Sequence, residues 1–302
     1  MTEAPAASPS PGELHVVDAP LAPPSANQGL LEVFRRRYLL RLLVRREISA
    51  RYQGSFLGLL WSYINPVAQF LIFYFIMGKL VGLAGRTENF AIHVFAGLIV
   101  VHFFVETFNA GTRSIVRNKQ LVQKMAMPRE MFPVATMLVS LWHVGPQLVI
   151  LMIACVYAGW TPDPAGIAAG LLAIAVIMVL GTSLALLFSA ANVFFRDFSS
   201  AVSVLTNFVR FSVPMIYPYT KVQERFGGHE NLYLANPIAD AVLLVQRAFW
   251  VGTTSDPAST TATDLPAHLF TRGLVALAAS LVVLVIAQLA FSRLENRIPE
   301  RL

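Results

Sequence analysis

Two long apolar segments are separated by the stretch Arg113-Ser-Ile-Val-Arg-Asn-Lys-Gln-Leu-Val-Gln-Lys-Met-Ala-Met-Pro-Arg-Glu-Met-Phe-Pro133. The stretch contains five Lys and Arg residues, its apolar residues have helical spacing, and Met127-Pro128 interrupts it. Basic loops of membrane proteins stay on the cytoplasmic side. We therefore predict a short basic helix on the cytoplasmic face of a membrane protein, where a soluble partner can bind it.

The composition also indicates an integral membrane protein. The 302 residues are 56% hydrophobic and 13% charged, whereas a soluble domain has about 25% charged residues. The net charge of +6 does not indicate nucleic-acid binding, because the arginines flank apolar segments and form no separate basic face. A single cysteine, Cys155, excludes an intrachain disulfide, and the six histidines show no metal-ligand spacing.

Six segments contain the roughly 20 apolar residues that a helix needs to cross about 30 Å of hydrocarbon. None has the alternating polarity of barrel strands, so the predicted fold is an all-α membrane protein with six transmembrane helices. Prolines inside three segments, Pro66, Pro146 and Pro214, predict kinks. The predicted spans are residues 56–80, 90–112, 131–157, 166–194, 199–219 and 268–292.

The distribution of Lys and Arg predicts that both termini are cytoplasmic. Sixteen of these residues lie before the first span or after the second, fourth and sixth spans, and five lie in the opposite loops. An excess of cations marks the cytoplasmic side. We expect a multi-pass protein of the bacterial cytoplasmic membrane.

Three regions are predicted along the chain. Residues 1–28 are rich in Pro, Ala and Ser, which indicates a disordered cytoplasmic tail. Residues 29–52 are too charged to cross a membrane and predict an amphipathic interfacial helix, which acts either as an anchor alone or also as a gate for an anionic lipid diphosphate. Residues 53–302 form the transmembrane domain. Within it, the external segment 220–267 is broken at Asn236-Pro237, which predicts short re-entrant or interfacial helices.

The chain lacks the motifs of a nucleotide-binding or catalytic protein. It contains no Gly-x-x-x-x-Gly-Lys-Ser/Thr, Gly-x-Ser-x-Gly or His-Glu-x-x-His sequence. We predict no catalytic residue, no metal site and no cofactor in this chain.

Two charges, Glu106 and Arg210, fall deep inside predicted spans. A lone charge at such depth is costly and needs a partner or water. Three alternatives follow: the two residues pair, Arg210 lines an aqueous path, or each is a separate polar anchor within the bundle.

Aromatic residues are concentrated in spans 1, 2 and 5. Most are expected to face lipid or to pack in the core, but a subset could line a conduit, because sugar rings have apolar faces that slide over aromatic rings. The absence of a charged binding pocket fits a long neutral polymer better than a small ion. The candidate channel-lining residues are Trp61, Tyr63, Phe70, Tyr74, Phe104, Phe108, Phe208 and Phe211, together with Glu106 and Arg210.

The segment around the first span reads Arg45-Arg-Glu-Ile-Ser-Ala-Arg-Tyr-Gln-Gly-Ser-Phe-Leu-Gly-Leu-Leu-Trp-Ser-Tyr-Ile-Asn-Pro66. It resembles the pattern R-D-x-x-x-R-Y-x-x-S-x-L-G-x-x-W-x-x-x-x-P of the membrane subunits of polysaccharide ABC exporters, which export O-antigen, teichoic acid and capsule. Residues 103–130 resemble the second span and coupling region of that family, with Met127 where Phe is usual. Phe194-Phe-Arg-Asp197 and Asn236-Pro237 extend the resemblance, which covers residues 31–300.

The resemblance implies a homodimer of six-helix permease subunits in contact with membrane lipid and with two copies of a separate ABC ATPase subunit, which binds ATP and Mg. Spans 1 and 5 of the two subunits would enclose a channel and its lateral gate. The residues implied to couple to the ATPase are Lys124, Met127, Pro128, Arg129, Glu130, Arg196 and Asp197.

The implied substrate is a glycan linked to undecaprenyl or decaprenyl diphosphate, whose diphosphate would enter near Arg45, Arg46 and Arg51. The Ala-, Val- and Arg-rich composition resembles that of actinobacterial proteins and would favour a cell-wall galactan. Two alternatives are efflux of a small molecule through the same scaffold and a membrane-embedded glycosyl- or acyltransferase. For such an enzyme, only Glu106 is suitably placed as a catalytic carboxylate.

Overall fold

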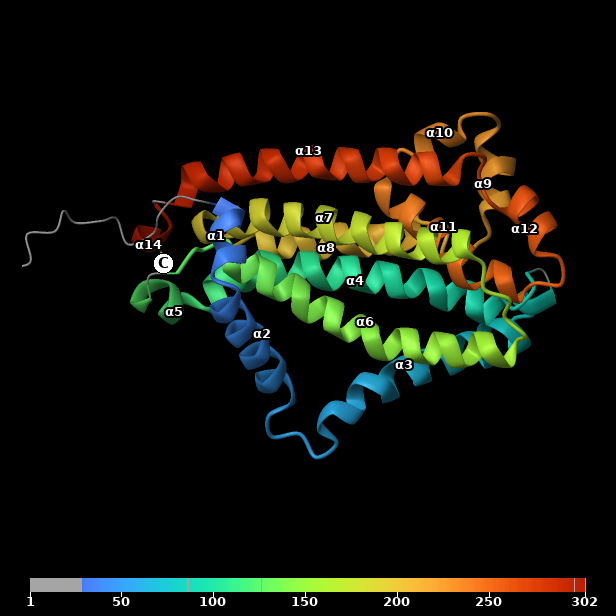
Figure 1. Ribbon diagram of the computed structural model, residues 1–302, viewed down its shortest axis with the longest axis horizontal. Coiled ribbons are helices and arrows are strands. Elements are labelled where there is room, and N and C mark those ends of the chain that lie inside the picture. Colours follow the sequence, from blue (N-terminus) through green and yellow to red (C-terminus); the bar gives the residue numbers. More distant parts are fainter. Residues whose placement is uncertain (1–28, 86, 126, 296, 302) are drawn as a thin grey trace, which may run out of the picture.

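The computed structural model describes residues 29–85, 87–125, 127–295 and 297–301, which contain helices and no strand. The predicted disordered tail, residues 1–28, lies outside the described residues. Long helices run side by side along the long axis of the molecule (Figure 1). Five helices of the described part are long and apolar enough to cross a membrane: Gly58–Leu80, Phe90–Arg117, Met131–Tyr157, Pro164–Phe194 and Leu269–Glu295.

Helix α4 (Phe90–Arg117) is the centre of the bundle. Its most apolar stretch is 89% buried, and it packs against α6 (Met131–Tyr157), α7 (Pro164–Phe194) and α11 (Pro237–Phe249). Small residues allow the close approach of α4 and α7: a Cβ atom on Gly111 would lie 2.4 Å from the Cβ of Ala185. Helix α13 (Leu269–Glu295) covers the other side of α7.

Four predicted spans agree closely with observed helices. The bounds of α6 coincide with the predicted span 131–157. Helix α7 begins two residues earlier than predicted, because the carboxylate of Asp163 caps it by accepting a hydrogen bond from the Gly166 amide. Helix α4 continues to Arg117, beyond the predicted end at residue 112, and α13 occupies the last predicted span.

The first span is irregular and lies at the periphery of the bundle. A 3₁₀ turn, η1 (Gly58–Leu60), leads into α3 (Trp61–Leu71), which continues as the π-helix η2 (Ile72–Leu80). Pro66 is accommodated inside α3. Only 6% of the most apolar stretch of this span is buried within the chain.

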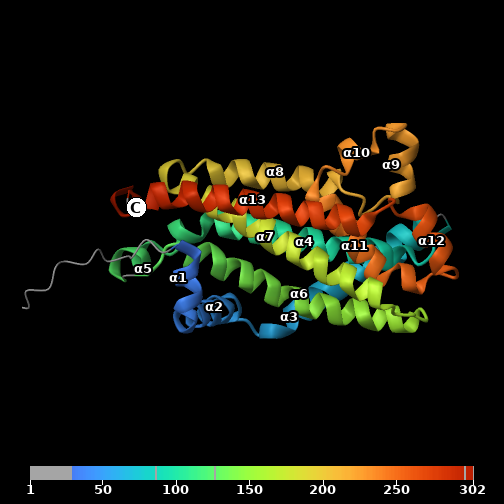
Figure 2. The same cartoon turned by 45° about the horizontal axis from the view of Figure 1, so that its top comes forward.

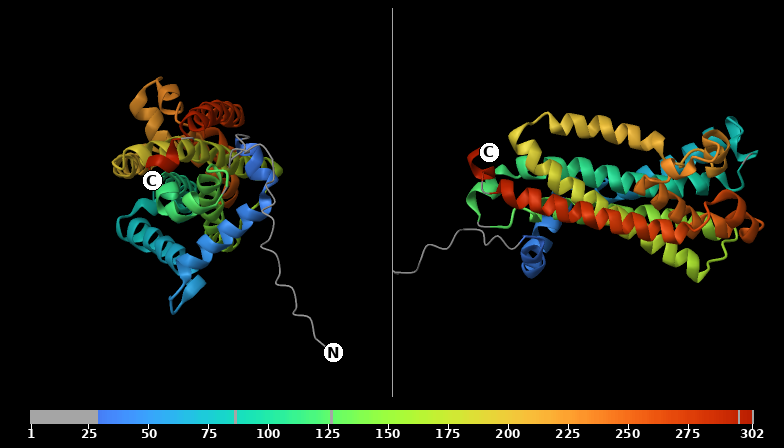
Figure 3. Two further views of the ribbon diagram at one scale, coloured as in Figure 1. Left: turned by 90° about the vertical axis from the view of Figure 1, so that its left-hand side faces the viewer. Right: turned by 90° about the horizontal axis from the view of Figure 1, so that it is seen from above.

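The predicted fifth span, 199–219, is longer than the helix found there. Helix α8 (Phe198–Ser212) has 15 residues, which corresponds to about 22 Å at 1.5 Å per residue. It ends because Val213, which precedes Pro214, is held in an extended conformation. Helix α8 runs along one side of the bundle and begins at the end of the molecule that carries the C-terminus (Figure 3).

Short helices gather at the two ends of the bundle (Figure 2). One end, called the α12 end, carries α9 (Tyr219–Phe226), α10 (Glu230–Tyr233) and α12 (Pro257–Asp264). The predicted break at Asn236-Pro237 is the start of α11, where the Asn236 side chain accepts a hydrogen bond from the Ile238 amide. After α11 the turn η4 (Val251–Thr253) leads into α12.

The opposite end, called the α5 end, carries α5 (Lys119–Lys124), α14 (Ile298–Arg301) and the junction between α7 and α8. The segment 29–52, predicted as a single helix, forms two: α1 (Gly29–Arg35) and α2 (Arg37–Tyr52). Helix α2 runs obliquely to the long helices, and the loop that follows it leads into the first span (Figure 1).

Candidate functional site

Helix α2 is attached to the bundle through polar contacts around Glu106. The guanidinium of Arg51 donates a hydrogen bond to the Glu106 carboxylate and forms an ion pair with it. The Nδ1 atom of His143 lies 3.4 Å from Glu106 Oε1 and 3.1 Å from Arg51 Nη1. Three elements, α2, α4 and α6, therefore meet at a single carboxylate.

Of the three alternatives for Glu106 and Arg210, an ion pair between them is not present in the structure, where Arg51 and His143 are the partners of Glu106. Arg210 lies on α8, is partly exposed and forms no ion pair or hydrogen bond with the residues that the structure describes. Glu106 is satisfied by Arg51 instead, because the end of α2 reaches alongside α4. A partner for Glu106 was expected from the cost of a lone charge within a span.

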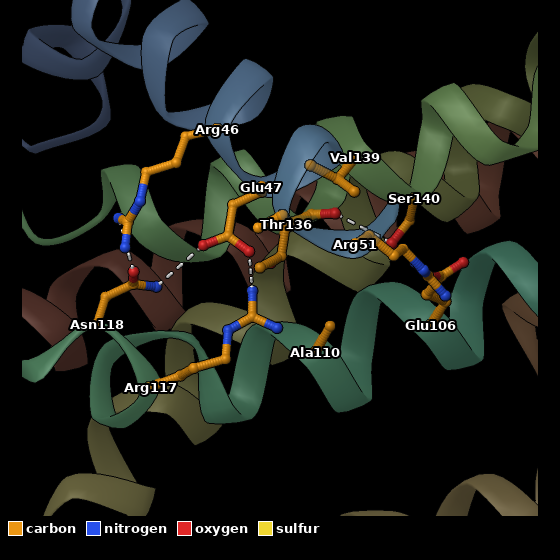
Figure 4. A pocket seen from close by; sticks show the side chains of 11 residues that line it. Arg46, Glu47, Arg51, Glu106, Ala110, Arg117, Asn118, Thr136, Val139 and Ser140 are labelled. Carbon is orange, nitrogen blue, oxygen red and sulfur yellow. Dashed lines mark hydrogen bonds and ion pairs between the residues drawn. The ribbon is translucent and has the colours of Figure 1, made fainter. Parts of the chain in front are cut away.

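A second polar contact joins α2 to the end of α4 (Figure 4). The carboxylate of Glu47 pairs with the guanidinium of Arg117 and accepts a hydrogen bond from Asn118 Nδ2 at 3.4 Å. Arg46 donates to Asn118 Oδ1 at 3.3 Å. Together with Arg51 and Glu106, these residues line a cavity of about 460 Å³ between α2, α4 and α6.

The three arginines predicted to meet a diphosphate have different surroundings. Arg45 is exposed and forms no ion pair within the described part of the chain. Arg46 and Arg51 line the cavity, but the charge of Arg51 is already balanced by Glu106. An anion that binds Arg51 must therefore compete with a carboxylate of this chain.

The predicted coupling residues separate into exposed and buried groups. Lys124 at the end of α5 and the pair Arg196 and Asp197 at the α7–α8 junction are exposed at the same end of the molecule. Met127 and Pro128, by contrast, are buried. The first group forms a surface that a partner can reach, and the second group anchors the start of α6.

Arg129 and Glu130 are also directed into this chain. The Arg129 guanidinium donates to the backbone carbonyl of Glu295 and lies 3.7 Å from its carboxylate. Gln288 Nε2 donates to Glu130 Oε1 at 3.0 Å, and Glu130 is 2% exposed. These contacts connect the segment after α5 to α13.

The candidate channel-lining aromatic residues also divide into exposed and buried side chains. Trp61, Tyr63 and Tyr74 on the first span, and Phe208 and Phe211 on α8, are exposed, while Phe70 packs partly against the core. The other two candidates, Phe104 and Phe108, lie in the core of this chain and are 1% and 4% exposed.

Sequence reasoning missed His143 and the Glu47–Arg117 pair. The histidines were interpreted only by their spacing for metal ligation, and no cluster that could hold a metal occurs among the described residues. A usable signal was present, because His143 is a polar residue inside an apolar span and needs a partner there.

Five helices of the described part are long and apolar enough to cross a membrane, and a short basic helix, α5, lies at one end of their bundle, as in a multi-pass membrane protein. The chain belongs to the ABC-2 type transporter family, whose model matches residues 38–250.

Relatives of the chain are transport proteins. An O-antigen export system permease protein RfbA from Myxococcus xanthus is 30% identical over 222 residues, which cover 72% of this chain and 83% of the relative. An RfbA protein from Klebsiella pneumoniae is 27% identical over 71% of this chain and 81% of its own length. The polysialic acid transport protein KpsM of Escherichia coli is 21% identical over 74% and 86% of the two chains.

These comparisons confirm the resemblance to polysaccharide ABC exporter permeases and the prediction of a transport subunit instead of an enzyme. The matched region extends from α2 to the end of α11. It includes the Glu106 network, α5 and the α7–α8 junction.

Proposed function

We propose that this chain is the permease subunit of an ATP-driven exporter that moves a lipid-diphosphate-linked polysaccharide, of O-antigen or cell-wall galactan type, across the cytoplasmic membrane. The main support for this proposal is the similarity of the chain to O-antigen export permeases over more than four-fifths of their length. The exposed aromatics of the first span and α8 support a sugar polymer as cargo.

In this proposal the α5 end faces the cytoplasm and binds two copies of a separate ATPase, which holds ATP and Mg. The exposed residues Lys124, Arg196 and Asp197 form the docking surface. Arg129 and Glu130 transmit movement to α13 through Glu295 and Gln288.

The membrane topology is part of the same proposal. Helix α8 completes a set of six spans, α1 and α2 lie at the cytoplasmic headgroups, and α11 enters the membrane from outside. Because the first span is hardly buried within one chain, we place it against a second copy in a homodimer. The exposed faces of this span and α8 then enclose the conduit.

The diphosphate of the substrate is expected to bind at the cavity between α2 and α4. Arg45 and Arg46 offer the first cationic groups, and Arg51 becomes available when the diphosphate displaces Glu106. Arginine suits this role because its planar guanidinium forms two parallel hydrogen bonds to an anionic oxygen pair.

Reconstitution tests the proposal. The permease and its ATPase are placed in proteoliposomes with a lipid-linked glycan, and both ATP hydrolysis and the amount of glycan protected inside the vesicles are measured. We expect transport that requires ATP and Mg and hydrolysis that responds to the glycan. The proposal is wrong if small amphiphiles stimulate hydrolysis and are transported while the lipid-linked glycan is not.

A further inference from the structure

Three helices of the bundle each carry two polar side chains spaced four residues apart. Such pairs lie on the same face of a helix, one turn apart. In an apolar span this spacing places four polar side-chain atoms, two from each residue, along one face of the helix. The pairs are Asn65 and Gln69 on α3, His102 and Glu106 on α4, and His143 and Gln147 on α6.

All three pairs line a single cavity between α3, α4 and α6. Arg51 and Tyr52, at the end of α2, and Ser62 of α3 also contribute to its wall. The cavity has a volume of about 430 Å³, which falls within the range of about 300–1,000 Å³ that is typical of ligand sites. It lies among membrane-length helices, where polar side chains are costly and mark functional sites.

Most of these polar groups have no partner in the described part of the protein. Glu106 is paired with Arg51 and His143. The side chains of Asn65, Gln69, His102 and Gln147 form no hydrogen bond with any residue that the structure describes, although Gln69, His102 and Gln147 are only partly exposed. Their donors and acceptors are therefore available to a ligand, and leaving them unpaired within the bundle carries a cost.

The chemistry of the wall limits the class of ligand. A metal ion or organic cation is disfavoured because the one carboxylate among the three pairs, Glu106, is already neutralised by Arg51. An acyl chain is disfavoured because its methylene groups would leave the amides unpaired. Carboxamides both donate and accept hydrogen bonds, as do the hydroxyl groups of a sugar.

Aromatic rings complete the wall. Trp61 and Tyr52 line the cavity, and the ring of Tyr52 lies 6.2 Å from that of His143 and 6.3 Å from that of Trp142. A pyranose has apolar C–H faces and a polar rim, so a wall that carries both rings and amides matches its two kinds of surface.

We propose that this cavity is a saccharide site, which binds the sugar residue next to the diphosphate of the lipid-linked substrate. The inference rests on the proposed function and adds a recognition element to it. Arg51 lines both this cavity and the one that contains Arg46. A diphosphate held by Arg46 and Arg51 would therefore have its attached sugar at the mouth of the saccharide site.

When the diphosphate and the sugar occupy the two neighbouring cavities together, the saccharide site can select between lipid carriers with and without a sugar. The diphosphate competes with Glu106 for Arg51, and the sugar engages the amides of α3 and α6. A lipid diphosphate without sugar makes only the first set of contacts. The permease then distinguishes a loaded lipid carrier from an empty one before transport begins.

The test compares two probes on the permease–ATPase complex in lipid nanodiscs: polyprenyl diphosphate, and the same lipid bearing one hexose or N-acetylhexosamine. Two hydrogen bonds of about 0.7 kcal/mol each predict about tenfold tighter binding of the sugar-bearing probe. In Gln69→Leu and Gln147→Leu this ratio should fall to about one to threefold, while the affinity for the sugar-free lipid stays within about twofold.

Gln223→Leu is the matched control, because it makes the same change at an exposed amide on α9, outside the cavity and outside the two helix faces proposed to enclose the conduit. It should keep the full ratio. Co-purification of the ATPase and the midpoint of thermal unfolding show that each variant is folded.

Several results would overturn the saccharide site. They are equal binding of the two probes by the unchanged protein, an unchanged ratio in both glutamine variants, or an equal loss of affinity for both probes. If ATP-dependent glycan transport persists in any of these cases, only the saccharide site is refuted. If neither probe binds and no glycan is transported, the proposed function fails as well.

Discussion

Arg51 of α2 and Glu106 of α4 form an ion pair that fixes the end of an oblique surface helix to the central helix of the bundle. Both residues are partly exposed, with side-chain exposures of 51% and 27%. The pair therefore contributes modestly to stability, about 1 kcal/mol or less. Its importance lies in the position that it gives to α2 and to the loop that follows.

Glu106→Gln should loosen the end of α2. Loss of about 1 kcal/mol increases the population of the detached state about fivefold, so amide hydrogen exchange at residues 45–55 should accelerate by a similar factor. The double swap Arg51→Glu with Glu106→Arg should exchange more slowly than either single change. Unchanged exchange in Glu106→Gln would mean that other contacts hold α2.

Charge reversal at Lys124 should weaken binding of the partner ATPase. Lys124→Glu and Arg196→Glu place anions on the exposed surface of the α5 end and should each reduce the affinity for the ATPase about tenfold, the effect of 1.4 kcal/mol. Co-purification at fixed salt measures this loss.

Lys221→Glu is the control for these reversals, because it makes the same charge change on α9 at the α12 end. It should leave ATPase binding intact. Equal losses in all three variants would show that net charge matters and that the α5 end is not the docking surface.

Glu130→Ala should destabilise the permease itself. The substitution removes the buried Glu130 acceptor and leaves Gln288 Nε2 with only Ser292 Oγ, at 3.2 Å, at a cost of about 1 kcal/mol. Glu130→Gln keeps an acceptor oxygen and should retain most of the stability in detergent unfolding. Normal stability of Glu130→Ala with loss of ATPase binding would instead support the direct contact that the resemblance implied.

Gly111→Ala should disturb the contact between α4 and α7. The added Cβ would lie 2.4 Å from the Cβ of Ala185, and such overpacking costs about 1–3 kcal/mol. Ala185→Gly in the same chain should recover stability, measured by chemical unfolding. Absence of this recovery would contradict a direct clash between the two helices.

Acid should weaken the contact between Asp163 and Arg247. The Arg247 guanidinium donates hydrogen bonds to both carboxylate oxygens of Asp163, at 3.0 and 2.6 Å, and these bonds lower the pKa of Asp163 below its usual value. The contribution is present above the unfolded pKa of about 3.9 and is lost as the pH falls through the folded pKa.

Because Asp163 is 43% exposed, this contribution should be below about 1 kcal/mol. Thermal midpoints between neutral pH and pH 3 should decline more for the unchanged protein than for Asp163→Asn. Parallel declines would show that other groups cause the acid sensitivity.

The sequence predicted the spans best where a long apolar run had clear limits, as for α6. It overestimated the fifth span, because the conformational restriction of Val213 before Pro214 ended α8 and did not merely kink it. Composition alone does not distinguish a proline that ends a helix from one that only kinks it.

The site was harder to predict, since its contacts join distant parts of the chain. Glu106 was expected to need a partner, but Arg51 belongs to a segment assigned to the membrane surface. The burial of Arg129 and Glu130 depends on Glu295 and Gln288, which lie 166 and 158 residues away along the chain. No local pattern reveals such contacts.

The unequal burial of the first two spans has a mechanical consequence. Helix α4 is almost fully surrounded by its own chain, whereas the span Gly58–Leu80 has few contacts within the chain and follows α2 through a short loop. A displacement of α2 can tilt that span while breaking few intramolecular contacts, and α4 keeps its place. The span Gly58–Leu80, which can move, and α4, which is held in place, are thus consecutive in the chain.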